Sequence, residues 1–505
     1  MAALTRLIAA LLVLAAAAAQ AGEFAAAYPQ ALAWFPEADR VGELEGEPKA
    51  APVLAGGQTV GYVFLTSDVV RIPAYSGHPI TSLVGFDLTG RIRGVAVVGH
   101  EEPILAIGVS EERLREFSAQ YRGKRVFDRI AIGAERPGHV SIDTISGATI
   151  TVMVQNQTLM QAARRVAGSR GLGERQSASA ADGEPLWRAV WEERRFRIGV
   201  LLAGLAALTL ILVLQDWFAR RPRLLLAVRR AFLAYTVLFI GWYGLAQLSV
   251  VHVLTFVHAA VRDFRWETFL IDPMIFILWS FVAFTLLLWG RGVFCGWLCP
   301  FGALQELVQQ GARRLGIRQL EFPEVVHERL WGVKYIVLLA LFGLSLQSMG
   351  EAVRYAEVEP FKTAFTLRFQ REWPFVLYAA GLIAVSAVNR KFYCKYLCAL
   401  GAALSIPGRF RVFDWWLRRR KECGRPCQVC AHECEVRAIR PTGEINANEC
   451  HYCLDCQVTY YDDRKCTPLL ERRQKREQRA AAARAQPVAF VRGAAGKNPR
   501  DREGV

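Results

Sequence analysis

The sequence predicts a multi-domain chain with an exported α+β domain, a polytopic α-helical membrane domain and a small cysteine-rich C-terminal domain. Three observations lead to this prediction. An apolar run from Leu7 to Ala19 opens the chain after Arg6 and has the form of an export signal. Five apolar segments follow between residues 198 and 389. None of the twelve cysteines precedes Cys295.

The export signal defines the first boundary. Small residues at Ala19-Gln20-Ala21 follow the apolar run and predict cleavage, which makes residues 1–21 a signal peptide. An uncleaved anchor is the alternative. In either case residues 22–190, which contain no membrane span, are expected to fold outside the cytoplasm.

Residues 22–190 have mixed polarity and predict an α+β domain. Residues 60–70 and 81–98 are expected to form strands, and Asp87-Leu88-Thr89-Gly90 interrupts the second stretch as a hairpin turn. A helical pattern runs from Ser146 to Arg165. A linker rich in Gly, Ser and Ala follows at 167–183.

The membrane domain is expected over residues 191–415. Each apolar segment is close to the ~20 residues that cross a bilayer. Arginines between the first two segments mark that loop as cytoplasmic. Five crossings then place the N-terminal domain in the periplasm and the C-terminus in the cytoplasm of a bacterial inner membrane, and a sixth span around 399–407 is the alternative. The predicted spans are 198–215, 232–257, 273–290, 333–348 and 374–389.

The net charge of +16 accompanies 53% hydrophobic residues. Basic residues that flank apolar segments explain this charge, because positive residues accumulate on the cytoplasmic side of membrane proteins. We therefore expect membrane lipid as a partner and no nucleic acid. The basic segment 471–505 is expected to be a solvated, partly helical extension without chemistry of its own.

An internal repeat lies within the membrane domain. Residues 291–303 align with residues 390–402, and each copy carries a Cys-x3-Cys motif after a span that ends in the cytoplasm. Two thiols four residues apart share one face of a helix. The four thiols of the two copies could meet to hold a further cluster or another metal. They could also act as redox dithiols, or be structural. They are Cys295, Cys299, Cys394 and Cys398.

The most specific signal lies in residues 416–470. Eight cysteines occur there at short spacings that are typical of iron–sulfur ligands, with triplets followed by a trailing thiol. These spacings predict a ferredoxin-like domain with two [4Fe-4S] clusters. Crossed ligation would join Cys466 to the first triplet and Cys434 to the second. A four-cysteine zinc module is the alternative. The eight are Cys423, Cys427, Cys430, Cys434, Cys450, Cys453, Cys456 and Cys466.

A loop in the exported domain ends at a predicted helix start. Gly147 and Ala148 let a ligand approach the backbone, and a helix N-terminus favours a phosphate, which the Thr149 hydroxyl could carry as an ester. The same residues also fit an ordinary helix start with Ser146 as the N-cap. The segment reads Asp143-Thr-Ile-Ser146-Gly147-Ala148-Thr149.

With these motifs in this order, the chain resembles the NosR/NirI family of membrane flavo-iron–sulfur proteins, and NosR most closely in its motifs. Residues 100–108 also look like the family's flavin domain, and the resemblance covers about residues 70–470. It implies FMN joined covalently to Thr149 and electron supply to a periplasmic reductase, which for NosR is nitrous oxide reductase in denitrification. This chain departs from the family pattern in two ways: it has Ala399 where the family motif has proline, and it is shorter.

We expect an electron-transfer component rather than a stand-alone enzyme, fed by quinol or by a cytoplasmic donor. A redox-sensing regulatory or maturation factor for the reductase is the alternative function. A transporter, suggested by the repeat alone, lacks the usual intramembrane carboxylates. His252 and His258 could serve a quinol or haem site, but their six-residue spacing favours polar residues at a membrane interface.

Overall fold

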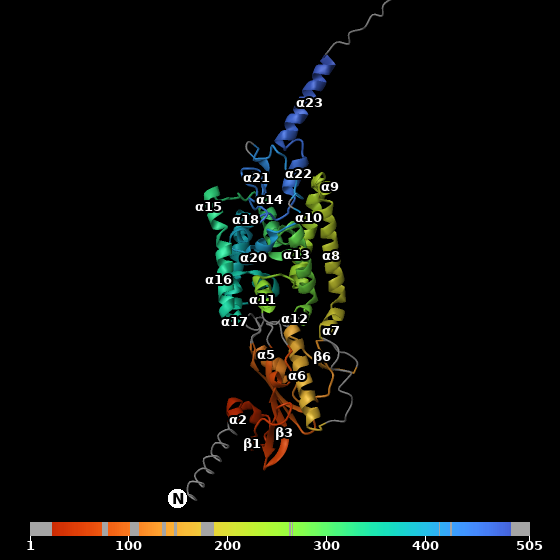
Figure 1. Cartoon of the computed structure of the whole chain (residues 1–505), viewed down its shortest axis with the longest axis vertical. Coiled ribbons are helices and arrows are strands. Elements are labelled where there is room, and N and C mark those ends of the chain that lie inside the picture. The colour runs from red at the N-terminus through yellow and green to blue at the C-terminus, as the bar shows by residue number, and fades with distance from the viewer. Residues whose placement is uncertain are drawn as a thin grey trace, which may run out of the picture.

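The computed structural model describes residues 23–485 except 73–78, 101–110, 134–137, 146–148, 173–185, 262–263, 265, 414 and 425–426. Figure 1 shows three parts along one long axis. The α+β domain lies at one end, a bundle of helices occupies the middle, and the cysteine-rich segment lies at the other end. The predicted signal peptide lies outside the described residues.

A five-stranded antiparallel sheet with strand order β1-β2-β3-β4-β5 forms the centre of the N-terminal domain. The predicted hairpin is confirmed, because Thr81 pairs with Gly99 at one end of β4–β5 and Phe86 with Ile92 at the other. The Asp87 carboxylate closes the turn by accepting the backbone N–H of Thr89 at 2.9 Å. The strands are β1 Arg40–Val41, β2 Ala51–Ala55, β3 Gln58–Leu65, β4 Thr81–Asp87 and β5 Ile92–Gly99.

Helices cover both faces of this sheet. One apolar core joins the sheet to α5 and α6, and a second joins it to the N-terminal helices. The strand expected over 60–70 ends at Leu65, and a single helical turn, α4, follows. The remaining elements are α2 Glu23–Ala27, α3 Gln30–Ala33, α4 Thr66–Val69, α5 Glu111–Ala119, α6 Thr149–Ser169 and the parallel pair β6 Ile130–Ile132 and β7 Val140–Ile142.

The middle part is entirely helical in the residues that are described. Its first half contains α7 Leu186–Glu193, α8 Arg195–Val213, α9 Gln215–Ala219, α10 Pro222–Tyr235, η2 Thr236–Tyr243, α11 Val250–Val261, α12 Trp266–Leu270, α13 Pro273–Trp289, η3 Phe294–Leu298 and α14 Pro300–Arg314. Its second half contains α15 Glu324–Leu330, α16 Val333–Gln347, α17 Met349–Tyr355, η4 Ala356–Val358, η5 Lys362–Thr366, α18 Trp373–Val388, α19 Phe392–Tyr396 and α20 Ala399–Gly408.

Three helices in the described residues are long and apolar enough to cross a membrane: 195–213, 222–243 and 324–347. Shorter apolar helices stand beside them at 250–261, 273–289, 373–388 and 399–408. Four of the five predicted apolar segments are thus continuous helices. The segment 399–407, considered as a sixth span, is a helix of ten residues.

The prediction of one continuous span over 232–257 is wrong. The helix ends at Tyr243, and α11 begins at Val250. The buried carboxylate of Glu359 holds the break, because it accepts the Ser249 hydroxyl at 2.7 Å and the Val250 N–H at 2.9 Å. It also accepts the Leu400 N–H at 3.0 Å, so one carboxylate binds the first turns of α11 and α20.

The C-terminal segment contains two short helices and one long one, α21 Val429–Glu433, α22 Asp455–Tyr461 and α23 Thr467–Ala485. The short helices lie against the bundle, whereas α23 extends away from it along the long axis (Figure 1). The expected helical character of the basic extension is confirmed as far as Ala485. Residues 486–505 lie outside the described part of the chain.

Candidate redox sites at the ends and centre of the helical domain

The two copies of the repeat build matching helix starts. Cys299 is the N-cap of α14, and Cys398 is the N-cap of α20. Each sulfur accepts a backbone N–H three residues later, from Gly302 at 3.4 Å and from Gly401 at 3.2 Å. The two sulfurs therefore occupy the same position in each copy, at a helix N-terminus whose partial positive charge would favour a negatively charged, metal-bound sulfur.

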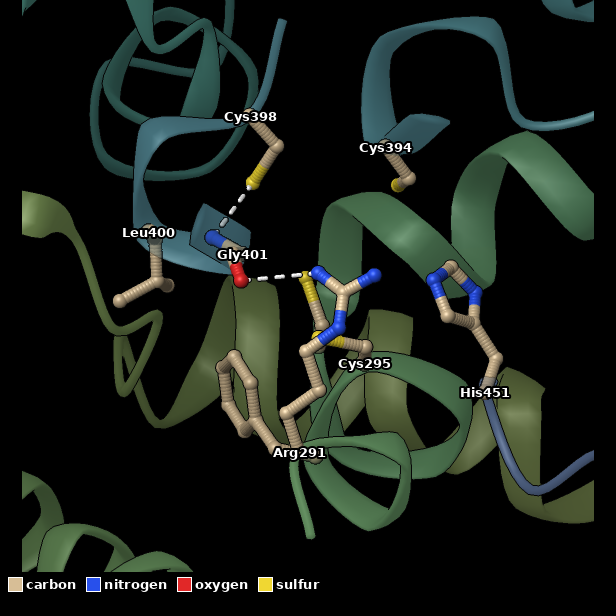
Figure 2. Close-up of a pocket in the computed structure, with 9 residues that line it drawn as sticks. Arg291, Cys295, Cys394, Cys398, Leu400, Gly401 and His451 are labelled. Atoms are coloured by element: carbon tan, nitrogen blue, oxygen red, sulfur yellow. Dashed lines mark hydrogen bonds between the residues drawn. The ribbon is translucent and has the colours of Figure 1, made fainter. Parts of the chain in front are cut away.

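All four repeat cysteines line one pocket, together with Arg291 and His451 (Figure 2). The prediction left open whether the two pairs meet, and the structure brings them to the same cavity. Cys394 also accepts a hydrogen bond from the Gln305 amide at 2.9 Å. Within the described residues no group of three or more His, Cys, Asp or Glu side chains lies close enough to hold one metal ion.

His451 was not identified from the sequence as a site residue. Its side chain points into the pocket from the cysteine-rich segment (Figure 2). Burial, and next the positive charges of Lys391 and Arg291, lower the pKa of His451 well below its usual range, so its imidazole is neutral. Its position directly after Cys450 was the only signal that the sequence offered.

The cysteine-rich segment docks closely on the first copy of the repeat. A Cβ atom on Gly296 would lie 1.7 Å from the carbonyl oxygen of His451, and one on Gly292 would lie 2.6 Å from that of Cys450. The Trp297 indole donates to the Tyr452 carbonyl at 2.9 Å. Only glycine permits such an approach of two backbones.

The second copy has lysine at both corresponding positions. Lys391 aligns with Gly292, and Lys395 aligns with Gly296. These lysines form ion pairs instead, Lys391 with Glu306 at 2.7 Å and Lys395 with Glu321 at 3.0 Å. The repeat is therefore symmetric in its cysteines and asymmetric in its docking surface.

Two buried charge networks connect the helices that carry the pocket. In the first, Glu306 binds Arg229 through both carboxylate oxygens at 2.7 Å, in addition to Lys391. In the second, Glu449 accepts from Arg291 at 3.1 Å and also pairs with Lys334. Neither network was predicted from the sequence, because their members lie far apart along the chain.

Among the eight tail cysteines, the first triplet lies together. Cys423 and Cys427 form a backbone bridge. Burial raises the pKa of Cys430 against the opposing effect of Arg419, and the nearby thiols of Cys423 and Cys427 add to the rise. Arg420 links this group to Cys466, because its N–H donates to Cys423 at 3.3 Å and its guanidinium donates to Cys466 at 3.1 Å.

The second triplet lies near Cys434. Burial raises the pKa of Cys456, the thiols of Cys450, Cys434 and Cys430 add to this effect, and a hydrogen bond from Gln457 opposes it. Burial also raises the pKa of Cys453, and Cys434 adds to that effect. Cys434 thus has second-triplet thiols as neighbours, Arg420 connects Cys466 to Cys423, and the crossed ligation stays a prediction.

The flavin segment is described only in part. Asp143 is exposed, and its backbone N–H donates to the Gln120 side chain at 2.7 Å. Thr149 is the first residue of α6, while residues 146–148, and all but the first residue of the 100–108 motif, lie outside the described residues. Val154, in the second turn of α6, shares a small buried cluster with Ile271 before α13. The first turns of α6, which follow the flavin segment in the chain, therefore pack against the helical bundle at Ile271.

The two histidines of α11 are engaged in local contacts. His252 accepts the Ser249 N–H through Nδ1 at 3.0 Å. His258 contacts the Ser345 hydroxyl at 3.4 Å. These contacts fit polar residues with partners, and the quinol or haem role stays a prediction.

Comparison with protein families finds matches in all three parts of the chain. A model of the FMN-binding domain matches residues 75–164, and one described as NosR matches residues 421–477. A model of a 4Fe-4S binding domain matches residues 271–318 and 372–422. Each of these two segments contains one Cys-x3-Cys copy.

Individual relatives cover most of the chain. The regulatory protein NosR of Pseudomonas aeruginosa is 38% identical over 89% of this chain and 93% of its own length. NosR of Stutzerimonas stutzeri is 36% identical over 93% of this chain and 94% of its own length. The protein NirI of Paracoccus denitrificans is 50% identical, over 62% of this chain and 46% of its own length.

Proposed function

Since this chain belongs to the NosR family and carries an FMN-binding domain and 4Fe-4S binding segments, we propose that it conducts electrons across the bacterial inner membrane. Iron–sulfur clusters at the cytoplasmic end would be linked to a covalently bound FMN in the periplasm. The recipient would be a periplasmic reductase of denitrification, nitrous oxide reductase, as the family resemblance implies.

The observation that carries this proposal is the position of the sites along one axis. Helix α6, which begins at Thr149, adjoins one end of the helical bundle through Val154 and Ile271, and the cysteine-rich segment docks near the other end. The four-cysteine pocket lies between them in the chain. Because a bilayer core is about 30 Å thick, a relay inside the protein shortens each electron step.

The donor sets suit the proposed cofactors. Eight thiols in two neighbouring groups fit two [4Fe-4S] clusters, with Cys466 completing the first group and Cys434 the second. The four pocket thiols, flanked by Arg291, fit a third cluster, and the 4Fe-4S family match at both copies supports this assignment over a pair of dithiols. When bound, such clusters supply one-electron carriers, and FMN supplies a centre that exchanges one or two electrons.

The proposed orientation places the cysteine-rich segment and the basic extension after it in the cytoplasm. Exposed Arg220 and Arg221 lie between α9 and α10, and exposed Arg223 follows in the first turn of α10. The Arg220 guanidinium lies 4.9 Å from the ring centre of Tyr461 in the cysteine-rich segment. Clustered arginines next to a span favour the cytoplasmic side. The opposite end of the bundle, with the FMN-binding domain, then faces the periplasm.

Replacing Thr149 by valine tests the flavin attachment. Valine keeps the branched shape but has no hydroxyl, so covalent flavin is expected to disappear completely while the iron content stays at the wild-type level. Flavin fluorescence of the protein band after denaturing electrophoresis measures the first effect. Thr144→Val, in the same loop but outside the motif positions, is the control and should keep its flavin. A fluorescent Thr149→Val band would contradict the attachment.

Iron and acid-labile sulfide in anaerobically purified protein test the clusters. About twelve irons per chain are expected for three [4Fe-4S] clusters, and about eight would restrict them to the tail. Zinc without acid-labile sulfide would overturn the iron–sulfur assignment altogether.

The name of the relatives from Pseudomonas aeruginosa and Stutzerimonas stutzeri, regulatory protein NosR, favours a second candidate function. In that role the redox state of the clusters would control expression or metal-site assembly of the reductase. In that case the Thr149→Val variant should change the amount of reductase transcript or the metal content of the reductase. In the proposed role both stay unchanged, and only electron supply to the assembled reductase is lost.

A further inference from the structure

The buried imidazole of His451 has no partner for one of its nitrogens. The residue is 3% exposed, and its Nδ1 atom is buried without a hydrogen-bond partner among the described residues. Leaving a buried polar atom unpaired costs about 1–3 kcal/mol. Because this side chain points into the pocket of four cysteines, its partner is expected to be a group that the pocket holds (Figure 2).

The backbone fixes where this imidazole lies. His451 is held against Gly296 by backbone contact, and the next residue, Tyr452, accepts the Trp297 indole N–H. Tyr452 itself has a φ of 52°, in the left-handed region that side chains rarely adopt. The loop is thus held in a specific conformation that directs His451 toward the thiols.

The chemistry of the pocket favours a cluster over a single ion. Four thiolates around one ion would lie about 3.8 Å apart, as follows from a metal–sulfur bond of about 2.3 Å. No group of three or more such side chains in the described residues lies that close, and the 4Fe-4S binding model that matches both copies of the repeat points to a cluster instead. The Arg291 guanidinium at the pocket wall donates to the Gly401 carbonyl at 2.8 Å and brings a positive charge to balance an anionic cluster.

We propose that His451 donates a hydrogen bond from Nδ1 to a sulfur of an iron–sulfur cluster held by the four repeat cysteines. The inference rests on the proposed third cluster and adds the residue that adjusts its reduction potential, since hydrogen bonds to sulfur raise that potential. His451 follows Cys450, a ligand of the second tail cluster. One short loop would therefore connect two redox centres.

An EPR-monitored redox titration of the full-length protein tests this role. In His451→Leu the reduction potential of one centre should become more negative, while the tail centres keep theirs. His451→Gln retains an N–H donor and should restore part of the shift. His432→Leu is the matched control, because His432 is an exposed histidine on α21 between two tail cysteines.

A measurement on the unmodified sequence covers the case in which His451→Leu fails to assemble. Pulsed EPR of protein labelled with ¹⁵N-histidine should show a weak nitrogen coupling to the pocket centre. A strong coupling would make His451 a direct ligand, and no coupling would remove it from the site; either result overturns the hydrogen bond.

Failure of the inference differs from failure of the proposed relay. If the protein has three iron–sulfur centres and His451→Leu changes none of their reduction potentials, only the role of His451 is overturned. Two centres and about eight irons in the wild-type protein would remove the third cluster itself, and with it this inference.

Discussion

Replacing Gly296 by alanine is expected to cost the protein one tail cluster, about four irons per chain. The added Cβ would lie 1.7 Å from the His451 carbonyl oxygen and 2.8 Å from its carbonyl carbon. Since both obstacles are backbone atoms, no change of side-chain rotamer can relieve the overlap. The loop that carries Cys450 and Cys453 must move, at or above the 1–3 kcal/mol typical of overpacking.

Iron and sulfide analysis with EPR of the reduced protein measures this loss. Gly311→Ala is the matched control, because Gly311 lies on α14 and no atom lies within 4 Å of its added Cβ. That variant should keep its full iron content. A Gly296→Ala protein with wild-type iron and an unchanged spectrum would show that the loop does not dock as described.

Replacing Glu306 by glutamine is the second change with a large expected effect. Glu306 is the shared partner of Arg229 and Lys391, and all three side chains are buried. Glutamine leaves two buried cations without this countercharge, although Lys391 keeps Glu435 at 3.8 Å. Breaking a buried ion pair from one side costs about 3–5 kcal/mol, so the detergent-solubilised protein should unfold at a clearly lower temperature.

A thermal denaturation series distinguishes this effect from a general loss of charge. Glu444→Gln removes the exposed partner of Arg440 and should change stability by less than about 1 kcal/mol. Glu306→Gln combined with Lys391→Met removes one stranded cation and should recover part of the loss. Equal midpoints for Glu306→Gln and the wild type would contradict a structural role for the network.

The sequence predicted the features that depend on residues close together in the chain. The Asp87–Gly90 hairpin is such a case, because Asp87 binds the Thr89 N–H two residues later. The prediction of iron–sulfur ligands in residues 416–470 rests likewise on short cysteine spacings. The positions of the spans follow from hydropathy wherever the apolar run and the helix coincide.

What the sequence could not predict depends on distant partners. The apolar run through 244–249 looks like continuous helix, and it is broken because Glu359, more than a hundred residues away, binds the first turn of α11. His451 reaches the pocket only because Gly296, in another part of the chain, admits its backbone. Neither contact leaves a local signature in spacing or hydropathy.

The first copy of the repeat has glycines where the second has lysines, and this difference decides how many surfaces of one chain can accept a cysteine-rich segment. A duplicated motif starts with two equivalent surfaces, each able to accept a cluster-bearing loop. With Lys391 and Lys395 on one of them, paired to Glu306 and Glu321, only the other accepts it. Each chain therefore offers one surface of this kind for a cysteine-rich segment, the one at Gly292 and Gly296.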